Sequence, residues 1–105
     1  MAAATRLAHN VFFKLKNPTD ANADALVAAC KQYLNVQPGI VFFAAGRICR
    51  ELDRDVNDQN WDVGLHLVFD SKASHDNYQD DPMHVKFVND HKPSWAGVRV
   101  FDSYV

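Results

Sequence analysis

Residues 61–91 constrain the fold most, because their hydrophobic pattern changes from the period of a strand to that of a helix. Over 61–69, apolar residues alternate with other residues and share one strand face: Trp61, Val63, Leu65, Leu67 and Phe69. Ser71 follows as a helix N-cap, since its hydroxyl can accept a hydrogen bond from a first-turn N–H. Pro82 cannot continue a helix but suits the first turn of a new one. The stretch therefore predicts a strand followed by two short helices that meet at Asp81-Pro82.

The second of these helices carries a histidine on its apolar side. His84, Phe87, Val88 and His91 are spaced i, i+3, i+4 and i+7, which places them on one helix face. Because Phe87 and Val88 favour burial, we expect the His84 ring to point inward, toward the strand. Tyr78 belongs to the preceding helix, and we expect Tyr78 and His84 to share a pocket.

The remaining elements complete a simple order. Strands are predicted at 7–16, 40–49 and 97–104, a helix at 21–35 and a polar loop at 50–60. This order, β-α-β-β-α-β with the second α split, is the α+β ferredoxin-like arrangement of an antiparallel sheet with helices on one face. A chain of 105 residues fits one domain, spanning 1–105.

The first strand separates its side chains onto two faces. His9 shares one face with Val11, Phe13 and Leu15, and we expect that face to meet the helices. Phe12, His66 and Val68 point to the other face, which would be an exposed apolar patch on a monomer. Pairing two sheets across a two-fold axis would bury this patch, so the sequence predicts a homodimer with His66 at its interface. His75 and His91 are expected at or near the surface.

Composition excludes several classes of function. The net charge is −2 and there is no basic stripe, which argues against nucleic-acid binding. The longest apolar run, 40–46, is too short to cross a membrane, and residues 1–7 lack the features of a signal peptide. We therefore expect a cytoplasmic protein in which the two cysteines, Cys30 and Cys49, are buried thiols.

No cofactor or metal site is predicted. The sequence has no Gly-rich phosphate loop, no G-x-S-x-G, no H-E-x-x-H and no C-x-x-C. The acidic residues of the polar loop, Asp53, Asp55 and Asp58, lack the glycine that an EF-hand loop needs. A metal held by several histidines would require the helix side and the strand side of the molecule to converge.

The candidate catalytic residues are His84, Tyr78 and His9. A histidine titrates near neutral pH and can transfer protons, and a tyrosine hydroxyl can stabilise a developing oxyanion. At a helix start, backbone N–H groups and the helix dipole disfavour the imidazolium, so His84 should be neutral at pH 7. The structural alternative is that Tyr78 caps the core, that His84 bonds a backbone carbonyl, and that His9 is satisfied by a neighbour.

Several short motifs resemble those of one family, the stress-responsive dimeric α+β barrel (Dabb) proteins. They are Phe69-Asp70-Ser71, Tyr78, Pro82-Met83-His84, His9 and Phe101-Asp102. The resemblance covers about 7–105 and implies a homodimer that forms a barrel from two sheets. In the family's polyketide cyclases, residues matching Tyr78 and His84 hold the substrate carbonyl and remove a proton. A further histidine of those cyclases is replaced here by Val63, which counts against cyclase chemistry.

Three functions are consistent with these features. The first is a dimeric barrel without an established reaction that binds a small apolar or aromatic molecule between helices and sheet. The second is an enzyme resembling a polyketide cyclase or a cofactor-free monooxygenase, using Tyr78 and His84. The third is a purely structural or interaction dimer. A ligand-sized pocket lined by Tyr78, His84 and His9 would favour the first two, and a filled core the third.

Overall fold

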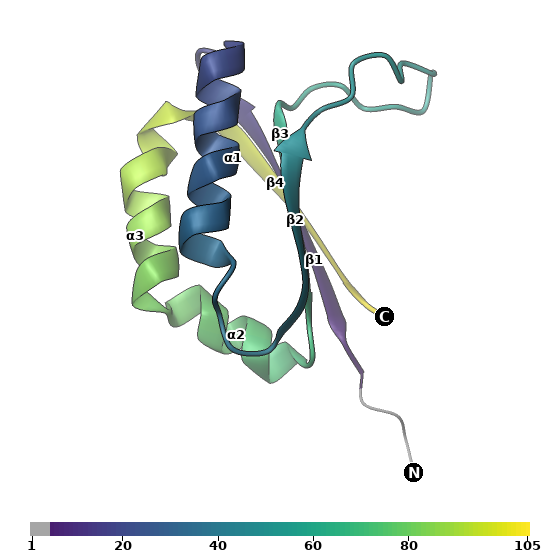
Figure 1. Cartoon of the computed structure of the whole chain (residues 1–105). Coiled ribbons are helices and arrows are strands. Elements are labelled where there is room, and N and C mark those ends of the chain that lie inside the picture. Colours follow the sequence, from purple (N-terminus) through teal and green to yellow (C-terminus); the bar gives the residue numbers. More distant parts are fainter. Residues whose placement is uncertain (1–4) are drawn as a thin grey trace.

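The computed structural model describes residues 5–105 and has the predicted element order. Its elements are β1 Leu7–Leu15, α1 Asp20–Leu34, β2 Ile40–Arg47, β3 Val63–Phe69, α2 Lys72–Asp80, α3 Pro82–His91, a 3₁₀ turn Lys92–Ser94 and β4 Trp95–Tyr104. The strands form one antiparallel sheet in the order β2-β3-β1-β4. Figure 1 shows all helices on the same side of this sheet. The predicted ferredoxin-like fold is confirmed.

Side-chain caps fix where the helices begin. Thr19 accepts a hydrogen bond from the Asn22 amide at 3.1 Å, and Ser71 accepts one from the Ser74 amide at the same distance. Asp81 ends α2 and caps α3 through the Met83 amide at 2.8 Å. Each carboxylate or hydroxyl satisfies an N–H that has no partner inside the helix. The chain therefore turns sharply between α2 and α3, and α3 runs alongside α1 (Figure 1).

The core lies between the sheet and the helices. β1 alternates strictly between buried and partly exposed residues, with Leu7, His9, Val11, Phe13 and Leu15 on the buried side. This confirms the predicted orientation of the first strand. Because β1 lies between β3 and β4, its buried face is at the centre of the molecule, and His9 is only 4 % exposed there.

The prediction that the third strand begins at Trp61 is wrong. The strand begins at Val63, and the Trp61 ring packs on the opposite sheet face, 4.9 Å from the ring of Phe12. The reason is Asp62, a buried carboxylate that accepts hydrogen bonds from the Leu15 amide and from Arg50. These bonds interrupt the alternation of the strand, so residue 61 does not follow its parity.

The predicted burial of both cysteines is correct only for Cys30. Cys30 is fully buried in α1, and burial raises the pKa of its thiol to about 12. Cys49 is exposed because β2 ends at Arg47, two residues earlier than predicted, and its thiol donates to Glu51. The loop that follows projects away from the body of the molecule (Figure 1). No helix in residues 5–105 has the length and apolar character needed to cross a membrane.

Candidate functional site

The structure brings the three candidate residues to one pocket of about 190 Å³ between the helices and the sheet. His9 comes from β1, Tyr78 from α2 and His84 from α3. The other walls are mostly apolar: Val11, Phe13, Leu34, Leu65, Gln79, Phe87, Val88, Trp95, Val98 and Val100. The geometry thus places His9, Tyr78 and His84 around a common space rather than in separate regions of solvent.

His84 is held in a defined tautomer. Its Nδ1 lies 3.1 Å from the backbone carbonyl oxygen of Gln79. A carbonyl only accepts, so Nδ1 carries the proton and neutral His84 has an unprotonated Nε2. Burial is the main reason that the pKa of His84 is lowered, while the Gln79 carbonyl opposes this shift. The direction agrees with the expected neutral ring, although burial rather than the helix start is the leading cause.

Tyr78 supplies a hydrogen-bond donor beside His84. The two rings are 4.6 Å apart between centroids, and Tyr78 is only 2 % exposed. Burial raises the pKa of the phenol, so the hydroxyl stays protonated at neutral pH. Among residues 5–105, no hydrogen bond of this hydroxyl is found. A pocket-bound oxygen atom would provide one.

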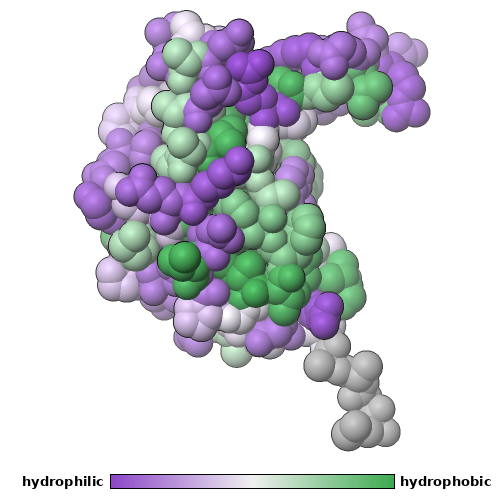
Figure 2. Space-filling view, viewed as in Figure 1, coloured by the Kyte–Doolittle hydropathy of each residue, from purple (hydrophilic) through white to green (hydrophobic). Residues whose placement is uncertain are grey.

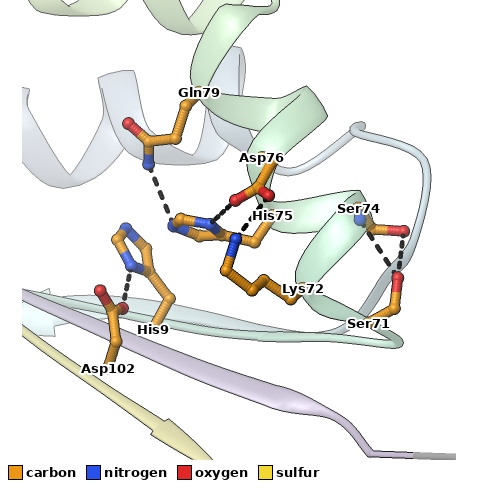
Figure 3. Close-up of polar contacts among 8 residues, drawn as sticks. All are labelled: His9, Ser71, Lys72, Ser74, His75, Asp76, Gln79 and Asp102. Carbon is orange, nitrogen blue, oxygen red and sulfur yellow. Dashed lines mark hydrogen bonds and ion pairs between the residues drawn. The ribbon is translucent and has the colours of Figure 1, made fainter.

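His9 is paired with an aspartate across the sheet. The register of β1 and β4 places His9 opposite Asp102, and His9 Nδ1 lies 2.5 Å from the carboxylate (Figure 3). The carboxylate accepts, so Nδ1 again carries the proton and Nε2 is the free ring nitrogen. Burial lowers the pKa of His9 overall, although Asp102 acts in the opposite direction.

These contacts are the ones that the structural alternative described. His84 bonds a backbone carbonyl, and His9 is satisfied by a neighbour. Each contact occupies only Nδ1, however, so both rings retain Nε2 for a further partner. Catalytic and metal-binding histidines characteristically donate one ring N–H to a carboxylate or backbone carbonyl in the same way.

Three residues near the pocket were not singled out as functional from the sequence. Asp102 could have been found, because it shares strand parity with Val98 and Val100. Gln79 is adjacent to Tyr78 and contributes its carbonyl to His84. Trp95 could not have been placed by parity, because a β-bulge between Lys14 and Leu15 shifts the register of β1 against β4. The Trp95 indole N–H is buried and has no partner within residues 5–105.

The other histidines lie outside the pocket lining. His75 is partly exposed, as expected, but its ring packs 4.9 Å from that of His9. His66 is on the opposite sheet face and bonds Asn10, and His91 is partly exposed at the end of α3. Val63 is fully buried in the core. A larger hollow of about 320 Å³ near Leu15 and His91 contains no comparable group of converging histidines.

Comparison with family models matches residues 7–105 to the stress responsive A/B barrel domain, Dabb. The chain belongs to the Dabb family. The match covers the whole sheet and all the helices, so the pocket lies entirely within the Dabb domain. Comparison with curated proteins returns no match.

Solved structures share the fold of this Dabb protein at low sequence identity. A Dabb protein with a ferredoxin-like fold from Mesorhizobium loti is 23 % identical, with a TM-score of 0.77 over 94 % of this chain and 95 % of that one. A dimeric ferredoxin-like protein of unknown function from Thermobifida fusca is 17 % identical, with a TM-score of 0.78 over 97 % and 92 %. Hydroxynitrile lyase from Passiflora edulis is 19 % identical, with a TM-score of 0.77 over 98 % and 95 %.

The lowered pKa of His84 predicts that this Dabb protein loses stability in mild acid. Unfolded His84 binds a proton near pH 6.5, whereas folded His84 binds one only at lower pH. Below about pH 6.5 the unfolded state therefore binds more protons, and the free energy of unfolding falls as the pH decreases toward the folded pKa. Well above pH 6.5, His84 is neutral in both the folded and the unfolded state, so this loss of stability is absent.

Urea unfolding at pH 7.5 and pH 5.5, in buffer containing EDTA, measures this effect. His84→Asn removes the titrating ring but keeps a donor for the Gln79 carbonyl, so its stability should decline less over the same interval. An equal decline in the two proteins would show that His84 does not contribute.

Proposed function

We propose that this protein is a homodimer that binds a small aromatic or apolar molecule carrying an oxygen acceptor in the pocket of His9, Tyr78 and His84. The observation that carries the proposal is the convergence of these three polar side chains on one otherwise apolar pocket. Ligand sites characteristically combine apolar walls with a few polar groups that orient the ligand.

The volume and the unpartnered donors define the ligand class. A pocket of about 190 Å³ is comparable to a cavity of about 150 Å³ that holds benzene in another protein. It therefore suits a molecule built on a single ring. The Trp95 indole N–H is a buried donor without a protein partner among residues 5–105. No hydrogen bond of the Tyr78 hydroxyl is found among the same residues. A carbonyl oxygen would accept from such donors.

Ligand-observed NMR with acetophenone and benzaldehyde tests the proposal directly. We expect both to bind, and Tyr78→Phe to weaken binding about tenfold, because a hydrogen bond contributes about 0.5–1.5 kcal/mol. Val56→Ala, at a residue 80 % exposed in the loop after β2, is the control and should leave affinity unchanged. Absence of binding by every single-ring carbonyl compound would contradict the proposal and favour the structural dimer.

A proton-transfer enzyme is the second candidate, and the tautomer of His84 favours it. Neutral His84 can accept a proton at Nε2, while the Tyr78 hydroxyl donates a hydrogen bond to an oxygen that becomes negative. The reaction class would be proton abstraction beside a carbonyl or from a hydroxyl. The hydroxynitrile lyase from Passiflora edulis has the same fold, which shows that this fold can support an enzyme active site.

Homodimer formation is supported by the sheet face that the helices leave open. Phe42 and Phe101 are each more than half exposed on this face, and Phe12 and Val68 lie beside them. Figure 2 shows hydrophobic residues gathered along β2 and the adjoining side of the sheet. A solved relative from Thermobifida fusca is described as dimeric. A second copy of the sheet would cover this surface.

Val68→Asp should dissociate the dimer. The substitution places one unpaired carboxylate from each protomer in an apolar interface, and such charges cost several kcal/mol. We expect the dissociation constant to rise about 100-fold or more in sedimentation velocity measurements. Val85→Asp, at a residue 44 % exposed on α3, is the matched control and should remain dimeric. Wild-type protein that sediments as a monomer at micromolar concentration would refute the dimer.

A further inference from the structure

A second group of side chains converges next to the pocket. His9 of β1, His75 of α2 and Asp102 of β4 each offer one ligand atom, and these atoms lie within 4.8 Å of one another. Figure 3 shows the His75 ring directed toward His9, and Asp102 below the His9 ring. Within residues 5–105, it is the one group of three or more His, Cys, Asp or Glu residues whose ligand atoms are close enough together to hold a metal ion. A histidine from the helix layer and a histidine from the sheet therefore meet at this point.

His75 is already oriented as a ligand would be. Its Nδ1 donates to the Asp76 carboxylate at 3.1 Å, and Lys72 holds Asp76 at 2.8 Å. A neutral His75 therefore has its lone pair on Nε2. Among residues 5–105, the hydrogen-bonding contact at this atom is a long one, 3.4 Å, to the Gln79 amide. Metal-binding histidines characteristically donate their second N–H to a carboxylate in this manner, which fixes both tautomer and ring orientation.

His9 and Asp102 supply the other two ligand atoms. A cation would take the place of the proton between His9 Nδ1 and the Asp102 carboxylate. Ligand atoms on one tetrahedral zinc are about 3.4 Å apart, so Asp102 must move outward by about 1 Å. Its side chain is 42 % exposed on an edge strand, which leaves room for this movement. The three ligand atoms are spread over up to 4.8 Å, so the partly exposed His75 ring must also move closer.

We propose that His9, His75 and Asp102 form a site for one divalent transition-metal cation per chain, best suited to Zn²⁺. Two imidazoles and one carboxylate are borderline ligands that select Zn²⁺ and its neighbours over Mg²⁺ or Ca²⁺. Three protein ligands leave a fourth tetrahedral position open. Because His9 also lines the pocket, the cation would lie at the pocket wall. Neither Tyr78 nor His84 is a ligand, so this inference does not depend on the proposed function.

Isothermal titration of tag-free, EDTA-treated protein with Zn²⁺ tests the site. We expect one cation per chain, and His75→Ala and Asp102→Asn should each weaken binding at least tenfold. Asp102→Asn can still accept from His9, so the fold should persist while a charged ligand is lost. Asp76→Asn, which alters only the carboxylate behind His75, should weaken binding about 10- to 100-fold. His91→Ala, at a partly exposed histidine elsewhere on the helices, is the matched control.

Co²⁺ provides a second measurement, because its visible absorption reports coordination geometry. Intense bands between about 500 and 700 nm, absent from His75→Ala, would support a tetrahedral site with nitrogen and oxygen ligands. Failure to bind Zn²⁺ at millimolar concentration would overturn the proposal. So would wild-type affinity in both His75→Ala and Asp102→Asn, or a stronger loss in His91→Ala. Loss of acetophenone binding in His84→Ala would remain a separate result, since it reports on the pocket alone.

Discussion

His84→Ala is expected to abolish detectable binding of acetophenone and benzaldehyde while the protein remains folded and dimeric. The variant removes a ring that lines the pocket with its Nε2 free and that packs against the Tyr78 ring. It also widens the pocket on the α3 side, so that a single-ring ligand loses contacts with the wall. The fold should tolerate the change, because Asp81 and Pro82 fix the start of α3 independently of His84. Ligand-observed NMR and sedimentation velocity measure the two outcomes.

His84→Asn separates the basic nitrogen from the structural contact. Asparagine can still donate to the Gln79 carbonyl, but it has no nitrogen that accepts a proton. If the protein is a proton-transfer enzyme, this variant should bind ligand and lose turnover. His91→Ala is the control and should change neither binding nor assembly. His75→Ala is not a suitable control, because His75 contacts the His9 ring. Ligand binding that persists in His84→Ala would contradict the assignment of the pocket.

Local periodicity was sufficient to predict that His9, Tyr78 and His84 face one region. Strand parity places His9 with Val11 and Phe13, and helical spacing places His84 with Phe87, and both relations hold in the structure. These relations depend only on backbone geometry within one element. For the same reason they could not predict which nitrogen of each ring is occupied, since Gln79 and Asp102 contribute those contacts from neighbouring elements.

Contacts between distant segments determine what the local pattern did not predict. Asp62 binds the Leu15 amide and Arg50, which moves Trp61 out of the strand and onto the open face. The β-bulge opposite Leu15 brings Trp95 to the pocket although parity places it elsewhere. Both features depend on long-range pairing, which the spacing of residues within one segment does not contain. The convergence of His75 with His9 is likewise set by how α2 packs on the sheet.

Phe69→Ala should produce the largest loss of stability among single substitutions near the site. Phe69 is fully buried at the end of β3, and its ring lies 5.1 Å from that of Tyr78, 5.6 Å from His75 and 6.3 Å from His9. Truncating a buried phenylalanine costs about 3–5 kcal/mol, since apolar contacts are lost and a cavity remains. That cost is a large fraction of the stability of a small domain.

Urea unfolding at fixed protein concentration measures this loss, with Phe69→Leu as a graded variant that should lose less. Val85→Ala, at an exposed residue of α3, should stay within about 0.5 kcal/mol of wild type. Because Phe69 lies beneath the rings of Tyr78, His75 and His9, its truncation should also weaken both ligand binding and Zn²⁺ binding. A Phe69→Ala protein that loses less than about 1 kcal/mol would show that the aromatic cluster does not support the two sites. Large loss of stability with unchanged Zn²⁺ affinity would show that the cation alone is enough to organise His9, His75 and Asp102.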